Sequence, residues 1–325
     1  MPGTSSQRRH LLLVAGAGRS GTSLVTGLVG RLGYHIPVPE VSADESNPKG
    51  FGEPRWAVDF HNDLLRSVNV APEDGRPEAW DIAADVASRP AARERLHEWL
   101  QEQFATTDRV VVKDPRLTWF LDLHLAVAGE MSVTASVLTM LRDPAESVKS
   151  RELAYGTKST PTTRMASWLN MMLGLEQRTR AVPRAYVSYD GLMADWRGSL
   201  GAAEEASGVP LLSGATAEQE ADADELVDAS LRRAQSDWDA LGLAPDLRDL
   251  AHRSWTALQS LGTTQPAAPA ELDQLEADYR TMYDAAAELT RSRVRAARVE
   301  ERRKAARVER EAQPTRPVWR RVLGR

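Results

Sequence analysis

The chain contains no cysteine among its 325 residues, which excludes disulfide bonds, thiolate nucleophiles and cysteine-ligated metals. It also lacks any run of about 18 apolar residues, the length that a helix needs to span a bilayer. No set of His, Asp and Glu residues has the spacing of metal ligands, so we predict that the protein binds no metal. We expect a cytoplasmic protein, because a chain without cysteine is compatible with that compartment.

Lysine is scarce as well. Only five of the 41 basic residues are lysines, and these are Lys49, Lys113, Lys149, Lys158 and Lys304. The bias toward arginine makes a single arginine weak support for a function, whereas each lysine becomes more informative. The net charge of -5 is unevenly distributed, because residues 291–325 carry 13 Arg and Lys against four Asp and Glu. The rest of the chain is therefore acidic, which argues against a nucleic-acid partner.

Short apolar runs alternate with helical patterns over the first 200 residues. Four apolar runs predict buried strands at residues 10–15, 108–112, 136–140 and 184–188. Helical spacing predicts helices at residues 21–32, 55–69, 91–105, 116–130, 144–153 and 164–181. This alternation predicts an α/β fold, a P-loop NTPase-like three-layer sandwich with a central parallel sheet.

The β pattern ends near residue 200, and the sequence beyond it is helical. We therefore predict an α/β core at 1–200, a helical cover completing the domain at 201–265, and a basic helical C-terminal extension at 266–325. Apolar residues in 271–311 are spaced in a loosely heptad-like way, but alanine at many of these positions does not favour a strong coiled coil. Two partners stay open for 271–325. One is a second copy of the chain, and the other is an anionic membrane surface, with the protein peripheral at the inner membrane face.

Residues 16–23 read Gly-Ala-Gly-Arg-Ser-Gly-Thr-Ser, which has the spacing of a Walker A phosphate loop. Thr22 occupies the position of the lysine that reaches the β- and γ-phosphates in nucleoside triphosphatases. The backbone N–H groups at the helix start would still bind an anion, and the Arg19 guanidinium can add a bidentate contact to phosphate or sulfate oxygens. The turn therefore predicts an anion site for a donor other than a nucleoside triphosphate.

The stretch 14–24, with this turn at its centre, resembles the 5′-phosphosulfate loop of sulfotransferases that use 3′-phosphoadenosine-5′-phosphosulfate (PAPS). Arg142, at a predicted strand end, and Ser150, eight residues later, resemble the family's 3′-phosphate site. The resemblance covers roughly residues 10–200, includes 187–195 as structural support, and points to the bacterial carbohydrate and tyrosylprotein-like branches. It implies PAPS as co-substrate, bound by Gly18, Arg19, Ser20, Gly21, Thr22, Ser23, Arg142 and Ser150.

Sulfuryl transfer to a hydroxyl needs cations for the oxygens on which charge accumulates. Lys113 ends a predicted strand in Lys-Asp-Pro and resembles the transition-state lysine of tyrosylprotein sulfotransferases. Arg19 would add a second cation at the transferred group. Asp114 and Arg116 are expected to pair with each other or with neighbours and to shape the turn after the strand.

The reaction also needs a base for the acceptor proton, and the sequence offers three candidates. The first is Glu53 in the Gly/Pro-rich loop 47–53, although this loop follows the phosphate turn at a longer distance than in the tyrosylprotein branch. Asp59 and His61, on the next predicted helix, are the alternatives, and we expect His61 at the surface. Pro115 stands where cytosolic aryl and steroid sulfotransferases have their catalytic His, so that base is absent.

These residues predict a PAPS-dependent sulfotransferase that sulfates a hydroxyl of a carbohydrate, glycolipid or natural product and releases adenosine 3′,5′-bisphosphate (PAP). Two alternatives stay open. Residues 110–114 form an imperfect Walker B sequence, which would fit a magnesium-dependent P-loop kinase or nucleotidase. A noncatalytic scaffold would instead act through residues 271–325.

Overall fold

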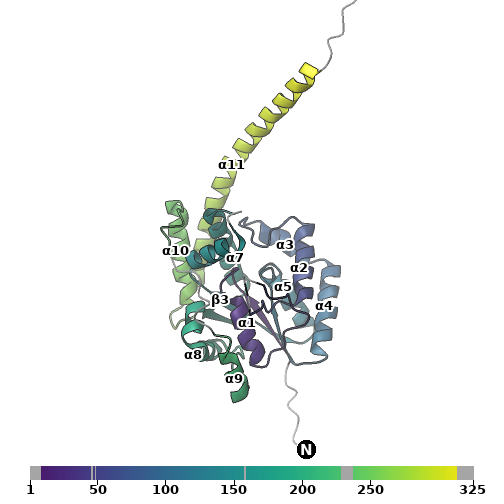
Figure 1. Ribbon diagram of the computed structural model, residues 1–325, viewed down its shortest axis with the longest axis vertical. Helices are drawn as coiled ribbons and strands as arrows, with labels where there is room; N and C mark the ends of the chain where they lie inside the picture. The colour runs from purple at the N-terminus through teal and green to yellow at the C-terminus, as the bar shows by residue number, and fades with distance from the viewer. Residues whose placement is uncertain (1–8, 45–46, 48, 157–158, 228–236, 313–325) are drawn as a thin grey trace, which may run out of the picture. The chain divides into compact units, whose positions relative to one another are not determined.

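The computed structural model describes residues 9–44, 47, 49–156, 159–227 and 237–312. The chain forms two compact units, Met1–Tyr279 and Arg280–Arg325 (Figure 1). The predicted core and helical cover thus lie in one unit. That unit extends past the predicted boundary at residue 266 as far as Tyr279.

A four-stranded parallel sheet forms the centre of the first unit. Its strands, β1 (His10–Ala15), β2 (Arg109–Lys113), β3 (Thr134–Leu141) and β4 (Arg184–Ser188), lie in the order β2-β1-β3-β4. Leu12 pairs with Val111 on one side and with Ser136 on the other. All of β1 is buried, because a parallel sheet is covered on both faces. The four predicted strands are confirmed, with ends shifted by two residues or fewer.

Helices make up most of the remaining described chain. They are α1 (Thr22–Arg31), α2 (Arg55–Ser67), α3 (Ala79–Ala87), α4 (Pro90–Phe104), the 3₁₀ turn η1 (Leu117–Phe120), α5 (Leu121–Glu130), α6 (Pro144–Tyr155), α7 (Pro161–Arg178), α8 (Tyr189–Ser207), α9 (Ala217–Asp224), α10 (Pro245–Ser260) and α11 (Pro269–Ala312). The predicted helices of the core are confirmed, and the one predicted at 116–130 is divided into η1 and α5. Helix α3 was not predicted, because its nine residues are too few to display helical spacing.

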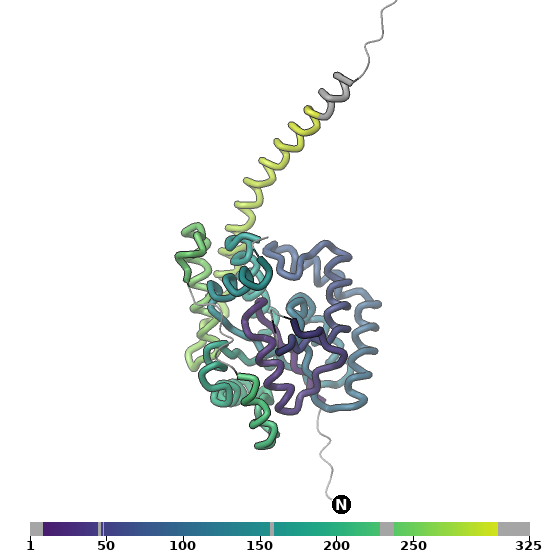
Figure 2. The backbone as a smooth tube through the Cα atoms, in the orientation of Figure 1, coloured from purple at the N-terminus to yellow at the C-terminus, as the bar shows by residue number. Residues whose placement is uncertain are grey.

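The helices cover both faces of the sheet. On one face, Leu12 and Val14 pack in a buried cluster with apolar residues of α1 and α8. Leu11 and Leu13 point to the opposite face, since successive strand side chains alternate, and α4 contacts β2 while α5 contacts β3. Figure 2 shows the blue helices α2 to α4 on one side of the first unit and the green helices α8 to α10 on the other. The predicted α/β three-layer fold is confirmed.

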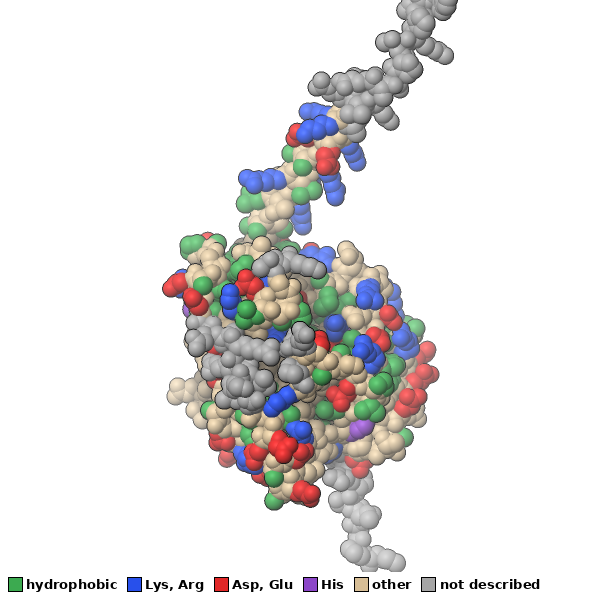
Figure 3. All heavy atoms as spheres, in the orientation of Figure 1, with side chains coloured by type: hydrophobic (Ala, Val, Ile, Leu, Met, Phe, Trp, Pro, Cys, Tyr) green, Lys and Arg blue, Asp and Glu red, His purple; other side chains and the backbone are tan. Residues whose placement is uncertain are grey.

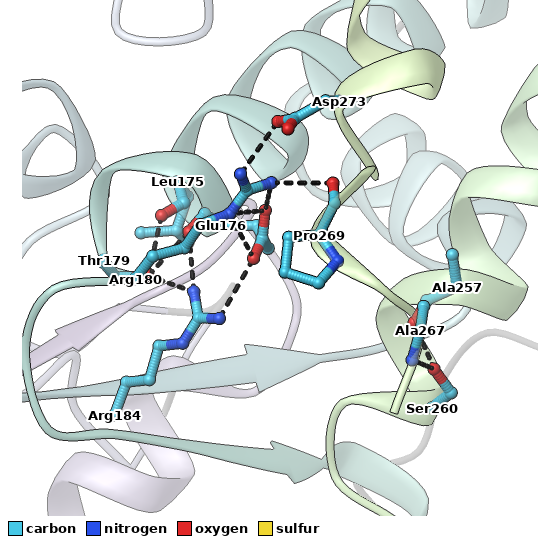
Figure 4. A network of polar contacts seen from close by, with 10 residues as sticks. All are labelled: Leu175, Glu176, Thr179, Arg180, Arg184, Ala257, Ser260, Ala267, Pro269 and Asp273. Atoms are coloured by element: carbon cyan, nitrogen blue, oxygen red, sulfur yellow. Dashed lines mark hydrogen bonds and ion pairs between the residues drawn. The ribbon is translucent and has the colours of Figure 1, made fainter. Parts of the chain in front are cut away.

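A buried carboxylate joins three elements of the first unit. Glu176, near the end of α7, is 1% exposed and accepts hydrogen bonds from Arg180 at 2.6 Å and from Arg184 at 3.0 Å. Arg180 also pairs with Asp273 of α11 at 2.9 Å (Figure 4). Two guanidinium groups compensate the buried charge, and they fix the early turns of α11 to α7 and β4. This contact attaches the first turns of α11 to the first unit.

Two buried histidines make the fold sensitive to acid. Burial lowers the pKa of His10 from 6.5 to about 4 and that of His124 from 6.5 to about 3. The unfolded chain therefore binds protons below pH 6.5 that the folded chain does not. We expect the free energy of unfolding to keep its full value above about pH 6.5 and to fall by up to about 1.4 kcal/mol per pH unit for each histidine below it.

Urea denaturation between about pH 7 and about pH 4.5 measures this dependence. The variant His124→Leu should show a shallower loss of stability with falling pH, because one of the two groups no longer titrates. An unchanged slope in this variant would contradict the assignment.

The second unit contains the exposed part of α11. Among its described residues, the exposed large apolar side chains are Leu289, Val294 and Val299. They follow one another at five-residue steps, each of which rotates by about 140° around a helix, so they form no continuous apolar stripe. Figure 3 shows Arg and Lys side chains along this part of the helix. No helix in the described ranges is long and apolar enough to cross a membrane, and the basic tail after residue 312 lies outside them.

Candidate active site

A cavity of ≈ 430 Å³, here called the central cavity, lies where β1, β2 and β3 end. Its walls include nine of the predicted site residues, which are Gly18, Arg19, Gly21, Thr22, Ser23, Glu53, Lys113, Arg142 and Ser150. Ser20 is buried, with 1% exposed, and does not line it. Ligands of open α/β sheets bind outside the carboxyl ends of the strands. The structure thus brings residues from four separate segments together at the expected edge.

The turn between β1 and α1 depends on its glycines. Gly16 and Gly21 have φ angles of 142° and 95°, values that favour glycine. A Cβ on Gly21 would also lie 2.6 Å from the ring of Tyr189. Helix α1 begins directly after Gly21 and receives no side-chain cap. Its first backbone N–H groups can therefore bind an anion.

Arg19 joins the turn to the second predicted element of the donor site. Its φ of 71° is a left-handed value that costs a non-glycine residue on the order of 1 kcal/mol. In this conformation the carbonyl of Arg19 accepts a hydrogen bond from Arg142 Nη1 at 2.9 Å. The Nε of Arg19 donates to Ser150 Oγ at 3.2 Å. The tips of β1 and β3 therefore meet through these three residues.

Arg142 is held in place from several sides. It follows β3 and is 8% exposed, and its Nε donates to Glu146 Oε2 at 3.0 Å. Its guanidinium lies 4.3 Å from the centre of the Tyr189 ring. Asp143 caps α6 by accepting from the backbone N–H of Ala145 at 2.8 Å. The cap fixes the start of α6, and about two turns later that helix presents Ser150 to the cavity.

Lys113 and Glu53 form an ion pair in the cavity wall. Lys113 Nζ lies 2.6 Å from Glu53 Oε1 and also donates to Ser23 Oγ and to the carbonyl of Phe51, both at 3.1 Å. The side chains of Lys113 and Glu53 are 3% and 9% exposed. An ammonium has three donors, and all three are engaged here. The lysine therefore links the end of β2 to α1 and to the loop that carries Glu53.

The two alternative bases are placed differently from Glu53. Asp59 is exposed on α2 and does not line the cavity. The expectation that His61 lies at the surface is wrong, because this residue is fully buried. Its Nδ1 lies 2.7 Å from Asp114 Oδ2. This hydrogen bond to a buried carboxylate explains why the polar ring of His61 lies in the interior. Neither residue can reach a substrate in the central cavity in this arrangement.

The carboxylate of Asp114 forms hydrogen bonds with neighbours outside the cavity. Oδ2 faces His61, and Oδ1 accepts from Arg116 Nη1 at 2.5 Å, which confirms the predicted pairing of Asp114 with Arg116. Although burial alone would raise it, these partners hold the pKa of Asp114 below its usual value. The imperfect Walker B sequence thus directs no carboxylate into the cavity. Within the described ranges, no three His, Asp or Glu residues are grouped to hold a metal, and the predicted absence of a metal stays a prediction.

Other charged residues beside the turn were not predicted. Glu73 lines the cavity next to Gly18 and forms an ion pair with Arg151. Burial, followed by the charge of Arg164, lowers the pKa of Arg151 to about 10. Lys49 donates to the carbonyls of Glu225 and Leu226 at 3.0 and 3.1 Å. The sequence carries no motif around Glu73, and only the folded chain brings it to the phosphate turn.

Comparisons with known proteins find a distant structural likeness and no sequence match. No protein-family model matches the chain, and no curated protein sequence matches it. Among solved structures, the sulfotransferase domain from the Synechococcus PCC 7002 olefin synthase aligns with 86% of this chain and 97% of that domain. The identity is 19% and the TM-score is 0.39. A likeness at this level assigns no function, which has to be argued from the site.

Proposed function

We propose that the protein is a PAPS-dependent sulfotransferase, which transfers the sulfuryl group of PAPS to a hydroxyl of an acceptor. The observation that carries this proposal is the meeting of Arg19, Arg142 and Ser150 beside the Lys113–Glu53 pair in one cavity. A donor with phosphate groups at both ends of its ribose needs two anion sites a short distance apart. The tips of β1 and β3 offer such a pair.

In this proposal the donor is held by two groups of side chains. The N–H groups at the start of α1, with Arg19 and the hydroxyls of Thr22 and Ser23, bind the 5′-phosphosulfate. Arg142 and Ser150 bind the 3′-phosphate through charge-assisted hydrogen bonds. The volume of ≈ 430 Å³ lies within the range of about 300 to 1,000 Å³ that is usual for small-molecule sites.

The transfer itself uses the Lys113–Glu53 pair. Glu53 accepts the proton of the acceptor hydroxyl while the hydroxyl oxygen forms a bond to sulfur. The bond between sulfur and the oxygen of the 5′-phosphate breaks, and PAP leaves with that electron pair. Lys113 and Arg19 stabilise the negative charge that develops on the bridging and sulfuryl oxygens. The products are a sulfate ester and PAP.

The acceptor is a carbohydrate, a glycolipid or a natural product with a hydroxyl group. Incubation of the protein with PAPS labelled in the sulfuryl group and a cell extract, followed by mass spectrometry, identifies the molecule that gains the label. We expect label in a small number of hydroxyl-bearing molecules, together with an equal amount of PAP. Transfer of a phosphoryl group from added ATP with magnesium, and none of sulfuryl, would refute the proposal.

Glu53→Gln tests the assignment of the base. The amide keeps the size of the side chain but accepts no proton, so we expect kcat to fall by about 10² to 10⁴ while the affinity for PAP changes little. Asp59→Asn is the matched control, because Asp59 is the exposed carboxylate on the adjacent helix. The assignment fails if Asp59→Asn loses as much activity as Glu53→Gln does. Initial rates with the labelled donor measure both variants.

A further inference from the structure

Helix α2 and the end of β2 are connected twice, by two buried pairs of side chains. The first pair is Glu53 with Lys113, at 2.6 Å in the cavity wall. The second is His61 with Asp114, at 2.7 Å behind that wall. Glu53 precedes α2 by two residues, whereas His61 lies inside it. Lys113 and Asp114 are consecutive, so both pairs join the same two segments.

The second pair has the features of a fixed support. His61 and Asp114 have side chains that are 0% exposed. Because Asp114 is ionised and can only accept, Nδ1 of His61 is the donor in this pair. The His61 ring stacks on Phe120 at 5.2 Å with an interplanar angle of 19°, and it also packs on His124. Ring packing and hydrogen bond together leave the imidazole one orientation.

We propose that His61 is a positioning residue for sulfuryl transfer, which acts through Asp114 and touches neither donor nor acceptor. This inference rests on the proposed function. The hydrogen bond from His61 sets the position of α2 along the end of β2. Glu53 lies two residues before α2, and its backbone carbonyl accepts a hydrogen bond from Val41 N–H at 2.8 Å. A shift of α2 would therefore pull on this short connection and move the Glu53 carboxylate relative to Lys113. The donor site on β1 and β3 does not depend on this contact.

Three variants separate the hydrogen bond from simple packing. His61→Leu fills the space and removes the donor to Asp114. His61→Asn retains a donor close to the position of Nδ1. His124→Leu is the matched control, because His124 is a fully buried imidazole in the same aromatic cluster but bonds only to the carbonyl of Phe120 among the described contacts.

We expect His61→Leu to lower kcat at least about tenfold. The Kd for PAP should change less than about threefold, because Glu53 and Lys113 act on the transition state and not on the binding of PAP. His61→Asn should recover most of the lost kcat, and His124→Leu should keep the kcat of the unmodified protein. Equal losses of kcat in His61→Leu and His124→Leu would overturn the proposal. A loss of PAP affinity in His61→Leu as large as its loss of kcat would also overturn the proposal. The substitution would then disturb the donor site as well as the Glu53–Lys113 pair. If His61→Leu does not fold, His61→Gln carries the same test, since its longer amide does not reproduce Nδ1.

Crystal structures of the variants give a result that does not depend on activity. In His61→Leu we expect Lys113 Nζ and Glu53 Oε1 to separate beyond hydrogen-bond range, about 3.5 Å, whereas in His61→Asn they should stay together. An unchanged pair in His61→Leu would refute the positioning role even if the unmodified protein transferred sulfuryl. If the unmodified protein bound no PAP, the proposed function would fail, and the structures would still show whether His61 holds the two residues together.

Discussion

Replacing Lys113 with methionine should lower kcat by about 10² to 10³, the usual effect of removing one preorganised contact to a developing negative charge. The affinity for PAP should change less than about tenfold, because PAP lacks the sulfuryl group that we propose Lys113 to stabilise. Methionine keeps the length and apolar stem of the side chain, so the change removes mainly the ammonium. Steady-state rates with PAPS and calorimetry with PAP measure the two effects.

Lys149→Met is the matched control for this prediction. Lys149 lies on α6 with its side chain 48% exposed and pairs only with nearby Glu152 among the described contacts, so kcat should not change. Lys113→Met also leaves buried Glu53 without its cation, and this unpaired charge would destabilise the fold by about 3 to 5 kcal/mol. The double variant Lys113→Met with Glu53→Gln removes that penalty, but it also removes the proposed base, so it tests only the cost to stability. Normal activity in a folded Lys113 variant would contradict the proposed role.

Removing the cation at residue 142 should abolish the preference for a 3′-phosphate. We expect the protein to bind PAP more tightly than AMP, since each charge-assisted hydrogen bond to the 3′-phosphate contributes about 1.5 to 3 kcal/mol. With Arg142→Gln, the affinity for PAP should fall by about tenfold to 100-fold, while the affinity for AMP changes little. Titration calorimetry with both nucleotides measures the selectivity directly.

The variant at residue 142 needs a partner change to stay folded. Arg142 pairs with Glu146, whose side chain is 4% exposed, so replacing Arg142 alone would break the ion pair of a buried carboxylate and destabilise the fold. The double variant Arg142→Gln with Glu146→Gln retains a hydrogen bond and removes both charges. Ser150→Ala should reduce the preference for PAP in the same direction but by less, because it removes a neutral hydroxyl. An unchanged ratio of PAP to AMP affinity in the double variant would show that the 3′-phosphate binds elsewhere.

The parts of the site that follow strand ends could be predicted from the sequence. Lys113 and Arg142 stand directly after apolar runs, and strands of a parallel sheet bring their ends to one edge. The glycine turn could be located because a turn of this kind needs positive φ angles, which glycine adopts readily and most other residues do not. In these places a local pattern determines where the side chain lies.

The features that the sequence did not predict depend on contacts between segments that are distant along the chain. His61 was expected at the surface because its helix pattern does not reveal Asp114 as a buried partner 53 residues away. Glu73 had no local pattern at all, and it reaches Gly18 only through the packing of its loop. The first unit extends to Tyr279 because the hydroxyl of this residue donates to the carbonyl of Gly75. In each of these contacts, the sequence around one residue contains no pattern that identifies its partner.

Calorimetric titration of the unmodified protein with PAP and with ATP, each with and without magnesium, measures the central property of the site. In the proposed function, two anion sites at the tips of β1 and β3 should favour PAP strongly and without any need for the metal. Tighter binding of magnesium–ATP than of PAP, or no heat of binding with PAP, would contradict the account.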